Sequence, residues 1–245
     1  MKILAQAVAN NTVAGFQRAA EAAGHKWVWW EEQHTPAFDV FDELQPDVLF
    51  FMEANRALLK CIQEFSPHMV QGFFHTPFEF DVNGQRLRCE RLVDTHIFCA
   101  GDPDPAYECS VGIVCPPNPL GLSLCNQLGK LNVKIVCEQP WPVAQYLGYG
   151  SLMTKRDLYR HSTIVMVPDL LEAMRVIACG SIPYATDSTV NELTGIQVEP
   201  DELTDWIHQL EINPQIRNET IKQLQKLVVN RTYDTALTTI SEAIK

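Results

Sequence analysis

The chain has 245 residues, of which 46% are hydrophobic and 20% charged, and its formal net charge is −11. This length and composition fit one large globular domain or two small ones with an ordinary core. No apolar run approaches the eighteen or so residues of a spanning helix, so we expect no membrane span. The eight cysteines form no CxxC pair and often lie in apolar runs, which indicates reduced thiols in a cytoplasmic protein.

The negative charge is concentrated in the first half of the chain. Residues 1–120 hold eight Lys and Arg against sixteen Asp and Glu. An acidic surface of this kind is a poor match for a polyanion such as nucleic acid. Two local basic clusters are exceptions, Arg86, Arg88 and Arg91, and Lys155, Arg156 and Arg160. Solvated charges on helices and loops are the favoured interpretation of most of these six residues.

Apolar runs alternate with amphipathic stretches in the first half. They predict strands at Ile3–Ala9, His25–Trp30, Val48–Met52 and Met69–Phe74, and helices at Val13–Ala23, Asp39–Leu44 and Ala54–Phe65. A fifth strand is predicted at Leu92–Ala100. This alternation is typical of a parallel, doubly wound α/β sheet.

The densest cluster of helix and strand breakers, Pro116–Gly121, predicts a linker between two domains, residues 1–118 and 122–245. A short apolar strand, Val111–Cys115, precedes it. A second alternation follows, with a strand at Val133–Cys137, a helix ending near Gly148, a helix across Lys155–Arg160 and a last strand at Gly195–Val198. From Asp201 onward the pattern is helical, with a break at Pro214.

Residues 161–187 predict a strand, a tight turn, a helix and another strand. The strands are Thr163–Val167 and Ile182–Ala185. Asp169 is a good N-cap, and Glu172, three residues later, has the spacing of a capping box. In a parallel sheet this helix begins at the carboxyl end of a strand, where its N–H groups and dipole favour an anion such as a diphosphate.

Two segments carry a family resemblance. Glu172–Met174 with Ala178–Pro183 resembles the E-A-M-A-x-G-x-P-V segment of GT-B-fold glycosyltransferases, especially retaining enzymes and the spore-maturation glycosyltransferase-like group. Residues 38–51 resemble the N-terminal half of the same group. The resemblance implies two Rossmann-like domains in a compact GT-B-like arrangement. Retaining relatives place a second Glu eight residues earlier, where this chain has Ile164, so nucleotide-sugar binding is implied more than any stereochemistry.

On this resemblance, Glu172 binds the ribose of a nucleotide-sugar donor; the alternative is a helix cap alone. The residues at the start of this helix, Asp169, Leu170 and Leu171, would face the diphosphate. Relatives neutralise the diphosphate with an Arg and a Lys that have no match here, and Lys155 and Arg156 are the candidate substitutes.

The acceptor would lie against the N-terminal domain. Asn10, Asn11 and Thr12 occupy the first turn after a strand, a usual ligand edge, although helix capping also explains Asn11 and Thr12. His75 follows a strand and suits proton transfer or a hydrogen bond to an acceptor hydroxyl; a structural loop histidine is the alternative. No G-x-G-x-x-G is present, so no dinucleotide cofactor is expected.

The predicted function is a metal-independent hexosyl- or pentosyltransferase that needs no cofactor beyond its nucleotide-sugar donor. The acceptor is open: a small glycan or metabolite, or a modified base in phage DNA. One alternative is a non-catalytic nucleotide or nucleotide-sugar binding protein. Another is a GT-A-type enzyme that holds a divalent metal with Asp102 and Asp104.

Overall fold

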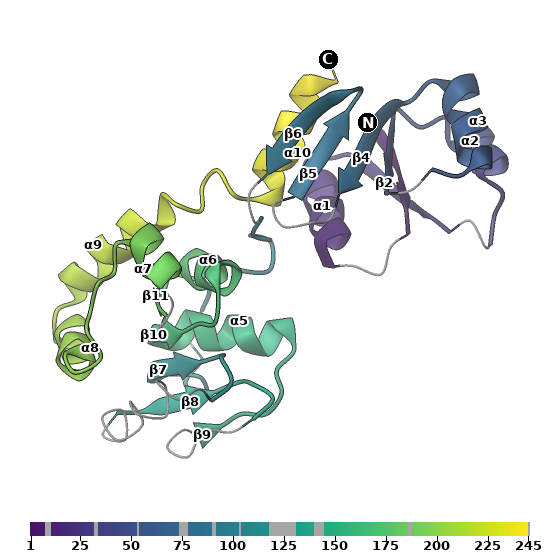
Figure 1. Cartoon of the computed structure of the whole chain (residues 1–245). Helices are drawn as coiled ribbons and strands as arrows, with labels where there is room; N and C mark the ends of the chain where they lie inside the picture. Colours follow the sequence, from purple (N-terminus) through teal and green to yellow (C-terminus); the bar gives the residue numbers. More distant parts are fainter. Residues whose placement is uncertain are drawn as a thin grey trace. The chain divides into compact units, whose positions relative to one another are not determined.

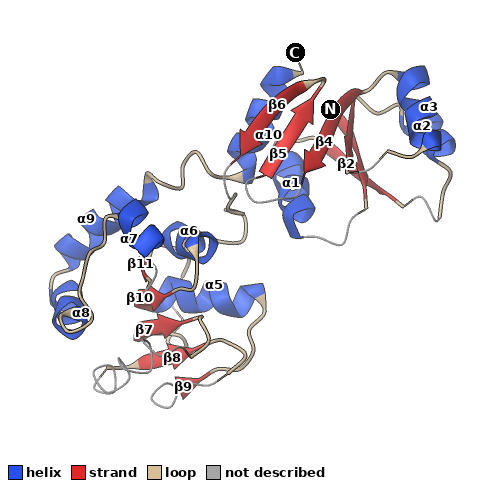
Figure 2. Ribbon diagram, in the orientation of Figure 1, coloured by secondary structure: helices blue, strands red, loops and turns tan. Residues whose placement is uncertain are grey.

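The computed structural model describes residues 1–7, 11–31, 34–52, 54–73, 78–89, 92–102, 104–117, 131–139, 145–185 and 188–244. The chain divides into two units: unit 1 comprises Met1–Leu92 with Arg231–Lys245, and unit 2 comprises Val93–Asn230. Both are α/β (Figures 1 and 2). None of the helices in the described part of the chain is long and apolar enough to cross a membrane.

Unit 1 contains a six-stranded sheet in the order β2-β1-β3-β4-β5-β6. The strands are β1 (Lys2–Gln6), β2 (Lys26–Trp30), β3 (Val48–Phe51), β4 (His68–Phe73), β5 (Phe78–Val82) and β6 (Gln85–Cys89); the helices are α1 (Asn11–Ala22), α2 (Ala37–Leu44), α3 (Arg56–Phe65) and α10 (Tyr233–Ala243). The first four strands are parallel, as predicted, because helices connect them.

Successive side chains of a strand point to opposite faces of the sheet, and here both faces carry apolar side chains. Helices therefore cover both faces. Ile3 and Ala5 on β1 pack in a cluster with residues of α1 and α10, whereas Leu4 packs in a second cluster with residues of α2 and α3. The Phe16 and Tyr233 rings join α1 to α10, with centroids 5.0 Å apart. The last helix therefore completes the core that the first helix begins.

An antiparallel hairpin extends the sheet where the sequence analysis predicted no strand. β5 and β6 are joined by Asn83 and Gly84, whose φ angles are 50° and 86°. Two-residue hairpin turns of type I′ need positive φ at both positions, and Asn-Gly is their preferred sequence. This dipeptide was the local signal for the hairpin.

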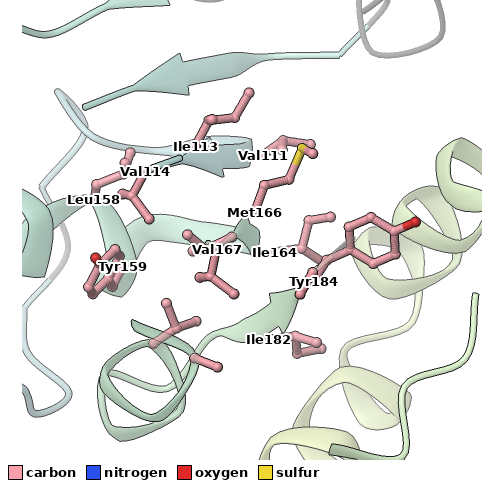
Figure 3. Packing of buried hydrophobic residues seen from close by; sticks show 14 of the residues in the cluster. Val111, Ile113, Val114, Leu158, Tyr159, Ile164, Met166, Val167, Ile182 and Tyr184 are labelled. Carbon is pink, nitrogen blue, oxygen red and sulfur yellow. The ribbon is translucent and has the colours of Figure 1, made fainter. Parts of the chain in front are cut away.

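Unit 2 contains a five-stranded parallel sheet in the order β11-β10-β7-β8-β9. Its strands are β7 (Cys109–Ile113), β8 (Val133–Ile135), β9 (Gln145–Tyr146), β10 (Ser162–Met166) and β11 (Ile182–Tyr184); its helices are α5 (Leu152–His161), α6 (Leu170–Ala178), α7 (Ser188–Thr194), α8 (Leu203–Ile212) and α9 (Pro214–Gln225). Figure 3 shows the core between β10, its neighbours and the helices, where Ile164, Val167 and Tyr159 are almost fully buried.

Three predicted elements differ from the structure. Leu92–Ala100 is not a strand, because Asp94 turns the chain: its side chain accepts the backbone N–H of His96, and its carbonyl oxygen accepts those of residues 97 and 98. The predicted last strand, Gly195–Val198, is a loop. At the predicted end of a helix near Gly148 the structure has strand β9 at residues 145–146.

The division between the units also differs from the predicted one at residues 118–122. β7 pairs with β8 and β10, so residues 93–117 belong to unit 2. α10 packs with α1 and belongs to unit 1. The cluster of breakers follows β7, but β7 pairs with strands that come later in the chain, so the boundary between the units lies before β7.

Candidate functional site

Unit 2 has a topological switch point between β7 and β10. From the central strand β7 the chain goes outward to β8 and β9, then returns to β10 on the other side of β7. The backbone N–H of Val114, just beyond β7, donates to the carbonyl oxygen of Met166 at the end of β10 (3.2 Å). In open parallel sheets, ligands bind outside the carboxyl ends of strands at such a point.

Helix α6 begins at this carboxyl edge. Asp169 caps it as the sequence predicted: its Oδ1 accepts the backbone N–H of Glu172 at 3.0 Å. The N–H groups of Leu170 and Leu171, the first two helical residues, have no acceptor within the helix itself. Asp169 is exposed, and both leucines are half-buried. The first turn of α6 therefore presents N–H groups near the switch point.

The carboxylate of Glu172 lies at the centre of a network of three donors. Oε1 accepts from Arg175 Nη1 at 2.8 Å and from Lys155 Nζ at 3.3 Å, and Oε2 accepts a short hydrogen bond from the Tyr159 hydroxyl. The residue is only 7% exposed. Glu172 thus joins α6 to α5 in addition to its place in the capping turn.

The charges around Glu172 decide its protonation. Burial by itself would raise the pKa of Glu172, but the positive charges of Arg175 and Lys155 and the Tyr159 hydrogen bond outweigh it and hold the pKa below its ordinary value. Burial, with the adjacent Glu172 charge, raises the pKa of Tyr159 well above its ordinary value. Tyr159 is therefore a donor and Glu172 an ionised acceptor at neutral pH.

Arg175 and Tyr159 were not singled out from the sequence. The i,i+3 spacing of Glu172 and Arg175 on a predicted helix was the available signal for one of them. Tyr159 lies on another helix, so no local pattern links it to Glu172. Phe98 orders both: the Arg175 guanidinium lies 4.9 Å from the Phe98 ring centroid, and the Tyr159 ring stacks on Phe98 at 6.1 Å.

The two basic candidates on α5 have different surroundings. Lys155, in the first turn of α5, reaches Glu172, and its side chain is 25% exposed. Arg156 is paired with the neighbouring Asp157 (Nη2 to Oδ1, 2.7 Å). The structure therefore brings Lys155, Asp169 and Glu172 together at the carboxyl edge, while Arg156 is held by a residue of its own helix.

The acceptor-side candidates lie in unit 1. Asn11 and Thr12 are the first residues of α1, the element that follows β1 in the chain, and so belong to the carboxyl edge of the sheet; Asn10 and His75 lie outside the described residues. Unit 1 also has a switch point, between β1 and β3. There the backbone N–H of Met52 donates to Gln6 Oε1 at 3.1 Å.

Asp102 and Asp104 do not follow a strand, because residues 95–99 form turns. The Asp104 carboxylate instead accepts the backbone N–H of Ala106 at 2.9 Å and caps a turn. Among the described residues, no three His, Cys, Asp or Glu side chains gather as candidate metal ligands. The strand that the GT-A-type alternative placed before Asp102 and Asp104 is not present at residues 95–99.

The arginine cluster of the DNA hypothesis lies on the hairpin of unit 1. Arg86 Nη2 pairs with Glu79 Oε2 at 3.0 Å, and Arg88 is opposite Glu79 in the strand register. Arg91 lies outside the described residues. Acidic partners on β5 thus offset at least part of this positive charge.

Comparison with solved structures supports the fold. A protein from Listeria monocytogenes assigned as a UDP-N-acetylglucosamine 2-epimerase matches with a TM-score of 0.61 and 8% sequence identity, over 100% of this chain and 95% of that one. Glycosyltransferase VinC (TM-score 0.47, 10% identity, 100% and 99% coverage) and an α,α-trehalose-phosphate synthase from Burkholderia xenovorans (0.38, 12%, 98% and 72%) match less well.

No family model matches the chain, and a search of curated proteins found no relative. The fold assignment rests on the first structural match and on the two sheets themselves. The expected class, α/β with two Rossmann-like units of the GT-B type, is confirmed.

Proposed function

We propose that the chain is a glycosyltransferase that binds a nucleotide-sugar donor at the carboxyl edge of the unit 2 sheet. The observation that carries this proposal is Glu172, ionised and nearly buried in the first turn of a helix that begins at the switch point. Its proposed role is to accept hydrogen bonds from the ribose hydroxyls. The N-terminal half of unit 1, with Asn10, Asn11, Thr12 and His75, is the proposed acceptor side.

The network around Glu172 leaves room for this role. A carboxylate has about four acceptor positions, and three are filled by Arg175, Lys155 and Tyr159. Lys155 makes the longest of these bonds, and its side chain is more exposed than that of Arg175. When a donor binds, the Lys155 ammonium turns to the diphosphate, and the two ribose hydroxyls take the open positions on Glu172.

In the proposed reaction, the leaving diphosphate is stabilised by the helix N–H groups of Leu170 and Leu171 and by Lys155. Arg156 joins them if it leaves Asp157. A hydroxyl of the acceptor attacks the anomeric carbon, its proton passes to His75, and the sugar–phosphate bond breaks. These parts need no metal, so transfer is proposed to continue in chelator.

The test is a ligand series by titration calorimetry: uridine, UMP, UDP and UDP-N-acetylglucosamine, chosen because of the nucleotide sugar named for the Listeria protein. Glu172→Gln should weaken binding of every member at least tenfold, about 1.4 kcal/mol. Lys155→Met should weaken UDP much more than uridine. Lys226→Met, an exposed lysine at the end of α9, is the matched control and should change neither.

Asp169→Asn separates phosphate binding from helix capping. Asn caps a helix as well as Asp, so stability should be kept, whereas the loss of a negative charge near the diphosphate should strengthen UDP binding. About 1 kcal/mol between unit charges at 4 Å in water gives roughly a fivefold gain. Weaker UDP binding in Asp169→Asn would place the diphosphate elsewhere.

A non-transferring sugar-nucleotide enzyme is the second candidate, favoured by the fold match to a protein assigned as an epimerase. Product analysis distinguishes the two. A transferase incubated with UDP-N-acetylglucosamine and a panel of acceptors would produce UDP and a glycoside. An epimerase would produce an epimerised sugar even when no acceptor is added. Binding without either product would leave a nucleotide-sugar binding protein.

A further inference from the structure

Unit 1 contains a cavity of about 970 Å³ that has no part in the proposed donor or acceptor sites. It is bounded by residues that come just before parallel strands: Met1 before β1, His25 before β2, Asp47 before β3 and Pro67 before β4. These positions define the amino edge of the sheet. Asn11 and Thr12 follow β1 and therefore belong to the opposite edge.

Two helices from opposite ends of the chain form the remaining walls. α1 contributes the side chains of Ala19 and, just after its end, Ala23, and α10 contributes Leu237 and Thr238. Ala19 and Leu237 belong to the hydrophobic core cluster between the two helices. The cavity thus has an apolar floor that continues into the core, and its volume matches that of small-molecule sites.

The polar part of the wall is acidic. Asp47, Asp234 and Glu242 line the cavity, and no Lys or Arg is among the described residues that line it. The amino group of Met1 also lines the cavity, and it contacts His25 Nδ1 at 3.3 Å. Burial, together with this ammonium, lowers the pKa of His25, so the imidazole is uncharged at neutral pH.

The second histidine on the wall is oriented by its neighbours. Asn83 Oδ1 accepts the backbone N–H of Met69 at 3.0 Å, so its Nδ2 is the group that faces His68 Nδ1 at 3.1 Å. Because Nδ2 can only donate, His68 Nδ1 is the acceptor in this contact. The wall therefore combines three carboxylates with two imidazoles.

We propose that this cavity binds a small organic cation, an ammonium or amidinium group on an apolar body. The apolar body packs against α1 and α10, and the charged group faces the carboxylates of Asp47 and Glu242. An anion of the same shape would meet the negative charges of these same two carboxylates. The site is independent of nucleotide-sugar binding, so its failure would leave the proposed function untouched.

Three probes with one apolar body test the proposal: phenethylammonium, 2-phenylethanol and 3-phenylpropionate. Binding to the full ¹⁵N-labelled chain is followed by amide shifts of residues 19, 237 and 238. We expect the cation to bind at least about fivefold tighter than the neutral probe at low salt, and this advantage to shrink at about 0.5 M salt because Asp47 and Glu242 are exposed. The anion should bind most weakly.

Variants locate the site. Glu242→Gln removes one carboxylate from an exposed position and should reduce cation binding at least twofold without changing binding of 2-phenylethanol. Thr238→Trp places a large side chain in the cavity and should abolish binding of all three probes. Thr239→Trp, at the adjacent exposed position of α10 outside the lining set, is the matched control.

Four outcomes would overturn the proposal. Equal affinity for the cation and the alcohol would make the cavity an apolar site without charge preference. Tighter binding of the carboxylate probe would reverse the charge argument. Amide shifts that survive in Thr238→Trp, or the absence of any shift with phenethylammonium, would remove the cavity as its site.

Discussion

Replacing Glu172 by Gln tests the network on α5 and α6 without any ligand. The amide keeps the size of the side chain and one acceptor oxygen, but it removes the charge opposite Arg175 and Lys155. These side chains are only 18% and 25% exposed, so solvent screens the two ion pairs little. At about 1 kcal/mol lost for each weakened ion pair, we expect unit 2 to lose about 2 kcal/mol of unfolding free energy.

The effect should depend on pH in a defined direction. The folded-state pKa of Glu172 is lower than its ordinary value of 4.5, so the carboxylate contributes stability that is fully present above that value. This contribution is lost as the pH falls through the lower, folded-state pKa. The stability difference between the wild type and Glu172→Gln should therefore be constant near neutrality and shrink in acid.

Because the chain has two units, a single unfolding transition need not report on unit 2. Hydrogen exchange of peptides covering residues 162–178, measured across urea concentrations, isolates the free energy of α6 and β10. The control is Glu219→Gln on α9, an exposed residue whose carboxylate accepts a hydrogen bond from Gln215 Nε2 at 3.0 Å. A difference under about 0.5 kcal/mol at neutral pH, or one that does not change in acid, would refute the reasoning.

Three further results are expected. Gly15→Ala should destabilise unit 1 by about 1–3 kcal/mol, because the added Cβ would lie 2.5 Å from a ring carbon of Tyr233; urea unfolding should show it, and an unchanged midpoint would mean that α10 shifts freely. Cys115 and Cys179 should resist iodoacetamide in the native chain at pH 8, since burial raises their pKa values to about 11 and about 12; rapid labelling by mass spectrometry would contradict the structure. UDP binding should survive chelator, and a requirement for Mg²⁺ or Mn²⁺ would overturn the proposed metal-free mechanism.

Local sequence signals predicted the helices and parallel strands well. Asp169 and Gly180 mark the limits of α6, and Pro214 is the first residue of α9, because caps and breakers act within one turn of their own position. Local signals gave a wrong prediction where one segment fitted two kinds of structure. The apolar residues after Leu92 suggested a strand, but Asp94 turns the chain there.

The site was predictable only in its local part. The capping role of Asp169 and the place of Glu172 followed from spacing, and both are observed. The contact of Glu172 with Tyr159 joins two helices that β10 separates along the chain, and the return of α10 to α1 spans almost the whole chain. Contacts of that kind depend on topology, which residue patterns do not encode locally.

The discontinuous composition of unit 1 has a consequence for biosynthesis. Residues 93–230 form unit 2 as one uninterrupted segment, so it is free to fold as soon as it leaves the ribosome. The first 92 residues emerge earlier yet must wait for Tyr233, because Phe16 on α1 is covered by that ring. During translation the part of α1 that packs on α10 is therefore exposed while residues 93–230, more than half of the chain, are made, an interval in which uncovered apolar surface favours chaperone binding.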